Sequence, residues 1–413
     1  MYTRREWTLL ALIFSGGAIS YMDRAAFGVL APLLQEDLAL DPAQMGLALS
    51  CFSLGYTLFT FIGGYLTDRI GAKRVLAAAM TVWSAFCALT GAVGGFATLL
   101  AVRFAFGAGE APFTPATSKI THAWFPAKRF AGAVGLSNAG LPLGGALAGP
   151  LVGVLAASWG WRAAFVLIGA IGVTWLLAWL WLARERPGGG VTPAAQGPAP
   201  AETEASASLL QAIAHRNVTA AAAGFFAYGY LLYFFLSWFP SYLAKNLGMD
   251  LKTMGLATAA PWAAGALGLI AGGFASDHLA RRLNDEARAR KLMIVWALAA
   301  AAVCVALAPQ FRTPATALPL MAAAIFFMYV TGANYTPLAA ASVPERHLGG
   351  VTGYLVFVAN IAGIAAPFVT GLIVKATGDF TAAFLLAGAI VIAGAAAVAL
   401  LSSAKLRPAG AAA

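Results

Sequence analysis

Charged residues inside apolar stretches are the part of this sequence best suited to chemistry. Asp23 and Arg24 stand side by side in SYMDRAAFGVLAPLLQ. Arg103 and Glu110 lie seven residues apart in another apolar stretch, so on a helix they would share a face, separated by roughly 10 Å. A charge at the centre of a membrane helix costs about 2.5–3.5 kcal/mol on insertion scales. We interpret these residues as functional, although a buried ion-pair network that only fixes helix packing is the alternative.

Each of these charges suits a step in moving an anion. The planar guanidinium of Arg24 is suited to the carboxylate of a substrate. Glu110 follows Gly107 and Gly109, and desolvation there would favour its neutral form, so it is expected to carry a proton. Asp23 is a second proton site, which we expect to pair with Arg103 when ionised. Because importing a monoanion against an inside-negative potential costs about 2.3 kcal/mol per 100 mV, uptake needs coupling to protons or another cation.

Composition indicates that membrane helices hold these residues. The chain of 413 residues is 61% hydrophobic and 10% charged, whereas a soluble domain has roughly 25% charged residues. Apolar runs of about 20 residues, enough to cross a bilayer, recur along its length. We predict an all-α membrane protein with twelve spans near residues 7–34, 43–67, 75–94, 96–122, 131–157, 163–183, 218–244, 253–276, 291–309, 315–342, 349–374 and 380–403.

The distribution of basic residues predicts the orientation. With the N-terminus placed inside, eighteen Lys and Arg fall on inner segments and five on outer loops, so both termini are expected in the cytoplasm. The net charge of +10 follows from this bias and does not indicate nucleic-acid binding. We expect a bacterial inner-membrane protein whose first segment is retained as a helix, since it is too long for a signal peptide and lacks a cleavage site.

A low-complexity tract divides the spans six and six. PGGGVTPAAQGPAPAETEASAS is expected to be a flexible linker. GGYLTDRIGAKR after the second span is echoed by GGFASDHLARR after the eighth, which indicates two pseudo-symmetric bundles around a midplane site. The predicted organisation is an N-terminal bundle at 1–186, a cytoplasmic linker at 187–215, a C-terminal bundle at 216–404 and a tail at 405–413.

These motifs carry a family resemblance. The loop at 64–74 resembles the most recognisable motif of the major facilitator superfamily, and the resemblance covers nearly the full chain. Within that superfamily the chain is similar to the anion:cation symporters, which include bacterial galactonate, hexuronate, glucarate and tartrate permeases. This closer similarity is carried by YMDRAAFGVLAP, RFAFGAGEAPFTPA with WFPAKR, SWFPSYL and NIAGIAAP. It implies alternating access, and at matching positions it implies the same roles for Arg24, Asp23, Arg103 and Glu110.

Several uncharged polar residues are candidates for the substrate site. The resemblance points to Tyr21, Tyr56 and Asn360 as groups that hydrogen-bond the anion. Asn334 and Thr336 are weaker candidates, for which core packing is the simpler interpretation. The same holds for Tyr233 and Trp262.

Two departures from the family bear on the substrate. Relatives that carry polyhydroxylated acids often have Gln where this chain has Thr60, and Asn where it has Val356. Both differences remove amides that could hold sugar hydroxyls. Besides a sugar acid, the substrate could therefore be a short dicarboxylate, an aromatic acid or a sulfonate.

The two related loops are expected to act as a conformational latch rather than to touch substrate. Asp at a helix C-terminus is otherwise unfavourable, so a partner Arg or a neighbouring helix N-terminus is expected. Lys119, near the inner end of its span, could serve function or simply extend to the headgroups. The predicted latch residues are Asp68, Arg69, Arg74, Asp277 and Arg282.

The remaining alternatives concern direction and class. Gly145, Gly149 and Gly153 with Pro150 resemble a pattern associated with exchangers, so an exporter or anion exchanger is the runner-up. An intramembrane enzyme or a receptor is more remote. No phosphate-binding G-x-x-x-x-G-K-[ST] loop occurs, and the histidines have no metal-ligand spacing. We therefore expect no cofactor, no metal and a functional monomer whose partners are an organic anion, protons and lipid.

Overall fold

The described part of the chain is built from helices. The structure is a computed structural model and describes residues 3–125, 127–183, 209–340, 342–344 and 347–402, with no strand among them. The first half contains α1 (Arg4–Asp37), α2 (Pro42–Ile70), α3 (Ala72–Thr90), α4 (Phe96–Glu110), α5 (Phe113–Trp124), α6 (Ala127–Asn138) and α7 (Gly140–Leu182). The second half contains α8 (Leu209–Ile213), α9 (Arg216–Leu247), α10 (Leu251–Leu283), α11 (Glu286–Leu307), η1 (Ala308–Gln310), α12 (Pro314–Thr331), α13 (Tyr335–Ala340), α14 (Leu348–Thr377) and α15 (Thr381–Leu401).

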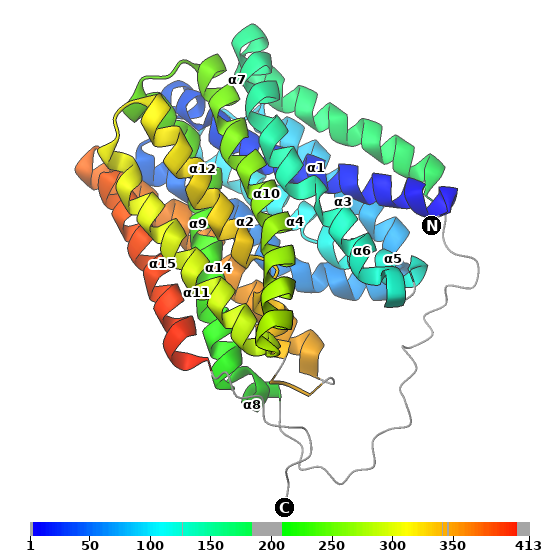
Figure 1. The fold of residues 1–413 in the computed structure, drawn as a ribbon. Coiled ribbons are helices and arrows are strands. Elements are labelled where there is room, and N and C mark those ends of the chain that lie inside the picture. Colours follow the sequence, from blue (N-terminus) through cyan, green and yellow to red (C-terminus); the bar gives the residue numbers. More distant parts are fainter. Residues whose placement is uncertain (1–2, 126, 184–208, 341, 345–346, 403–413) are drawn as a thin grey trace, which may run out of the picture.

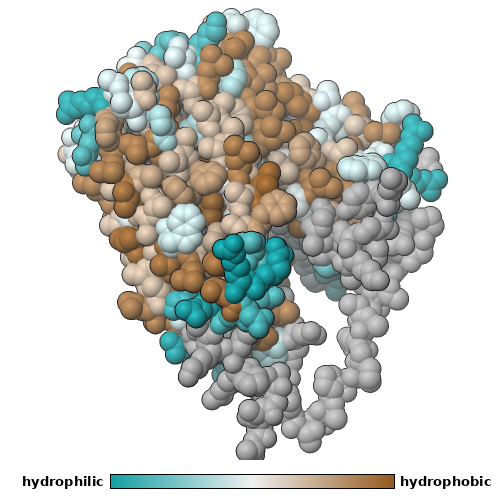
Figure 2. Space-filling model, viewed as in Figure 1, coloured by the Kyte–Doolittle hydropathy of each residue, from teal (hydrophilic) through white to brown (hydrophobic). Residues whose placement is uncertain are grey.

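These helices account for twelve membrane crossings. Nine helical segments of the described residues are long and apolar enough to cross a bilayer. One of them, Ala133–Leu182, contains two crossings because Gly160 leaves the helical conformation with φ of 79°. α1, which carries Asp23 and Arg24, adds one, and α4 with α5 adds another. Figure 2 shows the apolar residues as a broad band over the sides of the bundle.

Local sequence explains where several helices begin. Thr3 and Glu6 form a capping box at the start of α1, and Asp41 and Gln44 form one at α2. Asp250 caps α10 by accepting hydrogen bonds from two backbone N–H groups. Such side chains satisfy backbone donors that the first helical turn leaves free.

The two halves contact each other at the end of the molecule that carries the α1–α2 turn, here named the closed end. α2 packs on α14, α7 on α10, and α1 on α9. The Lys375 ammonium lies 3.0 Å from a carboxylate oxygen of Asp41, and Lys245 donates to Gln35. The hydroxyl of Ser50 also donates to the carbonyl of Ile364 across the halves.

Glycines make the closed end tight. A Cβ atom on Gly46 would lie 2.6 Å from the carbonyl oxygen of Pro367 and 3.2 Å from Cα of Gly371. On the other side of the bundle, a Cβ on Gly149 would overlap with Thr258 and with the carbonyl of Gly255. Two matching glycine contacts, α2–α14 and α7–α10, thus seal the halves because backbones can approach only where side chains are missing.

The opposite end, named the linker end, lacks these contacts in the described residues. On α2 the contacts with the second half involve Pro42, Gly46, Ser50 and Ser53, and none of the described contacts reaches the later turns. In Figure 1 the first residues of α1 and the last residues of α7 lie far from the first residues of α9 and α11 and from the last residues of α15. The halves therefore meet at the closed end and diverge towards the linker end.

Most of the expected linker lies outside the described residues. Within its predicted span of 187–215, residues 209–213 form α8, whose Leu209 packs against Gly350 of α14. The last residues of the predicted linker thus belong to a short helix. The predicted tail at 405–413 also lies outside the described part.

Candidate functional site

Arg24 and Glu110 form a buried ion pair between α1 and α4. Nε and Nη2 of Arg24 donate to the same carboxylate oxygen of Glu110, at 2.8 and 2.6 Å. The Ser20 hydroxyl donates to that oxygen as well, at 2.5 Å. The Glu110 side chain is fully buried and its other oxygen, Oε2, has no hydrogen-bond partner. One oxygen of the Glu110 carboxylate thus accepts three hydrogen bonds, and the other accepts none.

A proline determines the position of Glu110. Pro112 has no N–H to donate and its ring clashes with a carbonyl of the preceding turn, so α4 ends at Glu110 and α5 begins at Phe113. The C-terminal carbonyls of a helix carry partial negative charge, which opposes an ionised carboxylate. The donors on Arg24 and Ser20 offset this repulsion.

Asp23 and Arg103 are both buried, but they do not form the expected pair. The indole N–H of Trp83 donates to Oδ2 of Asp23 at 2.9 Å, and Oδ1 has no partner. Arg103 lies over the ring of Phe27, 4.0 Å from its centroid, and its Nε is unpartnered. The expected Asp23–Arg103 contact is therefore absent, since each group is held by an aromatic neighbour instead.

Two tyrosines of the first half surround the Arg24 guanidinium. Its central carbon lies 4.5 Å from the ring centroid of Tyr56 and 5.5 Å from that of Tyr21. The Tyr56 hydroxyl is 3.0 Å from that of Thr114 on α5. Tyr21 and Tyr56, both candidates for the substrate site, thus lie beside Arg24.

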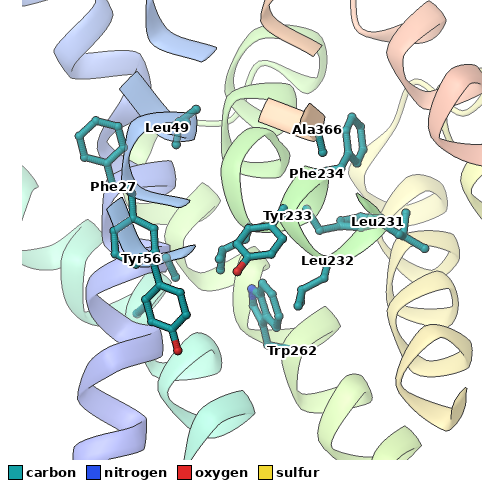
Figure 3. Packing of buried hydrophobic residues seen from close by; sticks show 14 of the residues in the cluster. Phe27, Leu49, Tyr56, Leu231, Leu232, Tyr233, Phe234, Trp262 and Ala366 are labelled. Carbon is teal, nitrogen blue, oxygen red and sulfur yellow. The ribbon is translucent and has the colours of Figure 1, made fainter. Parts of the chain in front are cut away.

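The second half presents a hydroxyl–amide pair towards these residues. The hydroxyl of Tyr233 on α9 donates to Oδ1 of Asn360 on α14 at 3.2 Å. In Figure 3 the hydroxyl of Tyr233 points towards the side of Tyr56. Gly363, one turn after Asn360, leaves room beside Tyr233 and the unpartnered hydroxyl of Ser53. Polar groups from α1, α2, α4, α9 and α14 therefore converge where the halves meet.

Trp262 lies close to this cluster but is held by packing. It is 3% exposed, lies against Gly145 of α7, and makes an edge contact with the ring of Tyr329. Figure 3 shows it beside Tyr233. Its described contacts are aromatic and backbone contacts.

Asn334 and Thr336 lie apart from the Arg24 cluster. Asn334 is fully buried in the break between α12 and α13, accepts from Ser276 and donates to the carbonyl of Val330. Thr336 is exposed on α13. No described contact connects either residue with Arg24 or Glu110, so the structure does not bring these two predicted site residues to the other predicted groups.

Of the two predicted latch carboxylates, Asp277 has the expected Arg partner, whereas Asp68 pairs with a Lys instead. Asp68 accepts from Lys119 on α5 at 2.7 Å, and Lys119 also donates to the carbonyl of Thr67. Asp277 accepts from Arg290 on α11 at 2.8 Å, and Arg290 also donates to Ser276. The basic residues predicted for these loops are placed differently: Arg69 stacks on Tyr65, and Arg74 and Arg282 are exposed.

Four residues in or beside the cluster are not among the residues predicted from the sequence. Ser20 is four residues before Arg24 and so shares its helix face, a signal that could have identified it. Thr114 lies four residues after Glu110. Trp83 carries no such signal, because its partner Asp23 belongs to a helix distant in sequence. The same holds for Ser53, which lies near Gly363 of α14.

Comparisons with known proteins agree with this architecture. A family model described as "Major Facilitator Superfamily" matches residues 13–336. The "Hexuronate transporter" of Bacillus subtilis (strain 168) is 39% identical over 394 residues, covering 95% of this chain and 93% of its own. The "Probable L-galactonate transporter" of Escherichia coli (strain K12) is 30% identical over 399 residues, covering 95% and 88%.

A solved structure shares the fold. It is a bacterial homolog of the human lysosomal transporter Spinster, in an inward-facing and occupied conformation, and it aligns with a TM-score of 0.80 at 18% identity over 99% of this chain and 100% of its own. The resemblance to hexuronate and galactonate permeases, and the fold of twelve membrane spans in two bundles, are confirmed. The chain belongs to the Major Facilitator Superfamily and is a membrane transporter, not an enzyme.

Proposed function

We propose that this transporter takes up a small organic anion together with protons. The observation that carries the proposal is the pairing of Arg24 with Glu110: the buried guanidinium donates twice to one carboxylate oxygen. When a proton neutralises the acid that pairs with a buried cation, the cation becomes free to bind a second carboxylate. The substrate's acid group would be that second carboxylate.

Charge balance provides the coupling. Arg24 and Arg103 are balanced by Asp23 and Glu110 while all four are ionised, and all four are buried. An arriving monoanion would leave one uncompensated negative charge in a region of low dielectric, which is strongly unfavourable. Protonation of Glu110 removes that charge and at the same time frees Arg24. Asp23, with one unpartnered oxygen, is the second proton site, and a second proton would let the membrane potential drive uptake.

The substrate to test first is a hexuronate, because a hexuronate transporter is 39% identical over almost the whole chain. The paired hydroxyls of Tyr56 and Thr114 and the Tyr233–Asn360 pair offer donors and acceptors for sugar hydroxyls. They offset the amides lost at positions 60 and 356, where Thr60 instead donates to the carbonyl of Tyr56. A smaller carboxylate or a sulfonate is the alternative substrate.

We further propose a bacterial inner-membrane location with both termini in the cytoplasm. The linker end carries most of the basic residues, which favours its placement inside. The described halves contact at the closed end, so this state would open towards the cytoplasm. In that orientation α1 begins on the side where substrate is released.

Uptake into proteoliposomes tests the proposal. An alkaline interior should drive accumulation of labelled glucuronate above the external concentration, and a proton ionophore should abolish it. Glu110→Gln should abolish this accumulation yet keep exchange of external for internal glucuronate, because a neutral amide leaves Arg24 available to the substrate. If Glu110→Gln still accumulated glucuronate in response to the pH gradient, the proton role of Glu110 would be wrong.

The same assay separates uptake from the runner-up functions. An anion exchanger would move glucuronate only when the opposite compartment holds a second anion. An exporter would be driven by the opposite gradient. A panel of carboxylates and sulfonates, compared by the thermal stabilisation of the purified protein, would identify the anion if glucuronate is inert.

A further inference from the structure

A cavity of about 410 Å³ lies at the linker end of the first half, away from the Arg24 site. It is lined by the first turns of α1, the end of α5 and the end of α7, and Figure 1 shows the start of α1 beside the end of α7. Most of the lining consists of two basic side chains, one hydroxyl, one indole and two leucines. These are Arg4 and Arg5, Thr8, Trp124, and Leu12 with Leu182.

The lining changes from apolar to basic along the membrane normal. Asp23 lies near the middle of α1 and is taken as the midplane reference. At 1.5 Å per residue, Leu12 lies about 16 Å along α1 from Asp23, and Arg5 lies about 27 Å from it, with helix tilt shortening both depths. Half of a hydrocarbon core is about 15 Å thick, and the headgroup layer extends it to about 20–22 Å. Leu12 is therefore at the edge of the hydrocarbon. The backbone of Arg4 and Arg5 lies just beyond the headgroup layer, and their long side chains can reach back to the phosphates.

Helix stability does not explain the two arginines. The first turn of a helix favours acidic side chains because the helix dipole is positive there. Thr3 and Glu6 already cap α1. Both arginine side chains are exposed, and neither has an ion-pair partner in the described residues. Two permanent positive charges thus lie at the rim of this cavity without an ionic partner among the described residues, next to the apolar side chains of Leu9, Leu12 and Leu182.

We propose that this cavity binds the headgroup of an anionic phospholipid from the leaflet that contains the N-terminus. The guanidinium forks of Arg4 and Arg5 match phosphate oxygens, and the Trp124 indole suits the interface between headgroup and acyl chain. The acyl chains would extend past Leu12 and Leu182 into the hydrocarbon. Such a lipid would join α1 to α7 at the linker end. This site is independent of the transported anion, so it survives a failure of the proposed function.

Thermal unfolding of the full-length protein in detergent tests the site, with native mass spectrometry to count bound lipid. Phosphatidylglycerol should raise the melting temperature, and phosphatidylcholine and inorganic phosphate should not. In Arg4→Gln/Arg5→Gln, the apparent affinity for phosphatidylglycerol should fall on the order of thirtyfold, the factor expected for two basic residues near a charged surface. Thr8→Trp keeps both charges but fills the cavity, and it should also abolish the shift.

The matched control is Arg281→Gln/Arg288→Gln, which removes the same charge from exposed positions at the linker end of the second half. This control should bind phosphatidylglycerol like the wild type. An equal loss in the control would mean non-specific attraction and would overturn the proposal. So would an unshifted wild type, an unaffected Thr8→Trp variant, or a shift with inorganic phosphate as large as that with the lipid, which would indicate a soluble phosphate ligand.

Discussion

At the scale of single residues, Arg24 is held by geometry as well as by charge. Two of its N–H groups donate to one oxygen of Glu110, and Tyr56 lies against its face. A lysine would keep the charge but lose the planar fork and the stacking. Glu110 in turn depends on Ser20 and Arg24 because α4 ends beside it.

Arg24→Lys should lower the rate of glucuronate uptake at least about tenfold, because a hydrogen bond to a charged group contributes about 1.5–3 kcal/mol. The rate in proteoliposomes measures this. Arg162→Lys is the control: Arg162 pairs with Asp37 at the exposed closed end, and its replacement should leave the rate within twofold. Equal rates for Arg24→Lys and wild type would contradict a binding role for the guanidinium.

Asn360→Ala should raise KM for glucuronate about tenfold while leaving the dependence on the pH gradient unchanged. The substitution removes the amide that orients the Tyr233 hydroxyl but no protonatable group. Thr336→Ala, at an exposed position away from the cluster, should leave KM unchanged. Initial rates over a range of glucuronate concentrations give KM for both variants. A rise in KM for Thr336→Ala alone would place Thr336, and not Asn360, at the substrate site.

At the scale of helices, the closed end depends on glycine–glycine contacts. Gly149 on α7 touches Gly255 and Thr258 on α10, and Gly46 on α2 touches Gly371 on α14. These crossings leave no room for a side chain. Because the closed end depends on missing side chains, one added side chain at a glycine should disrupt it.

Gly149→Leu should force α7 and α10 apart and expose the closed end. In a variant without the three free cysteines, Ser50→Cys reports this, since Ser50 is 2% exposed between the halves. An impermeant maleimide applied from the closed end should label this cysteine faster when Gly149→Leu is added. Gly353→Leu, on α14 with open space around it, should not change the labelling rate.

Asp41, the N-cap residue of α2, predicts that the stability of the protein depends on pH in the acidic range. The backbone N–H of Gln44, followed by the Lys375 ammonium, holds the pKa of Asp41 below its usual value. The stabilisation is therefore complete above the unfolded pKa, about 3.9, and is lost as pH falls through the lower folded pKa. Asp41→Ala should cost about 1 kcal/mol at pH 7 through loss of the cap. Wild type and variant should converge in melting temperature below about pH 3, as thermal unfolding would measure.

At the scale of the whole molecule, we expect transport to involve separation of the halves at the closed end and their contact at the linker end. The Asp41–Lys375 pair joins the halves, whereas the Asp37–Arg162 pair lies within the first half. This contrast offers a direct test of the motion. Both pairs are at the closed end, so reagents reach them equally.

Asp41→Cys/Lys375→Cys, bridged by a short bifunctional thiol reagent, should stop glucuronate uptake in a variant without native cysteines. A cleavable reagent should restore uptake after reduction. The control Asp37→Cys/Arg162→Cys carries the same bridge within one half and should keep transporting. Undiminished uptake by the bridged Asp41–Lys375 variant would exclude opening at this end.

The sequence by itself determined the membrane class, the twelve spans, the division into two halves and the charged residues at mid-depth. It could do so because lipid imposes long apolar helices and makes each buried charge costly, and both effects are visible residue by residue. The candidate role of Arg24 followed from its residue type, and that of Tyr56 from the family resemblance.

Tertiary structure decided which side chains meet across helices. Arg24 pairs with Glu110, Asp23 with Trp83 rather than Arg103, and Tyr233 with Asn360. It also placed Asn334 with Ser276 and made Lys119 and Arg290 the partners of the loop carboxylates. Depth along a helix can be counted from the sequence, but the rotation of each helix is fixed by packing against neighbours distant in the chain. That rotation determines whether two charges at the same depth face each other.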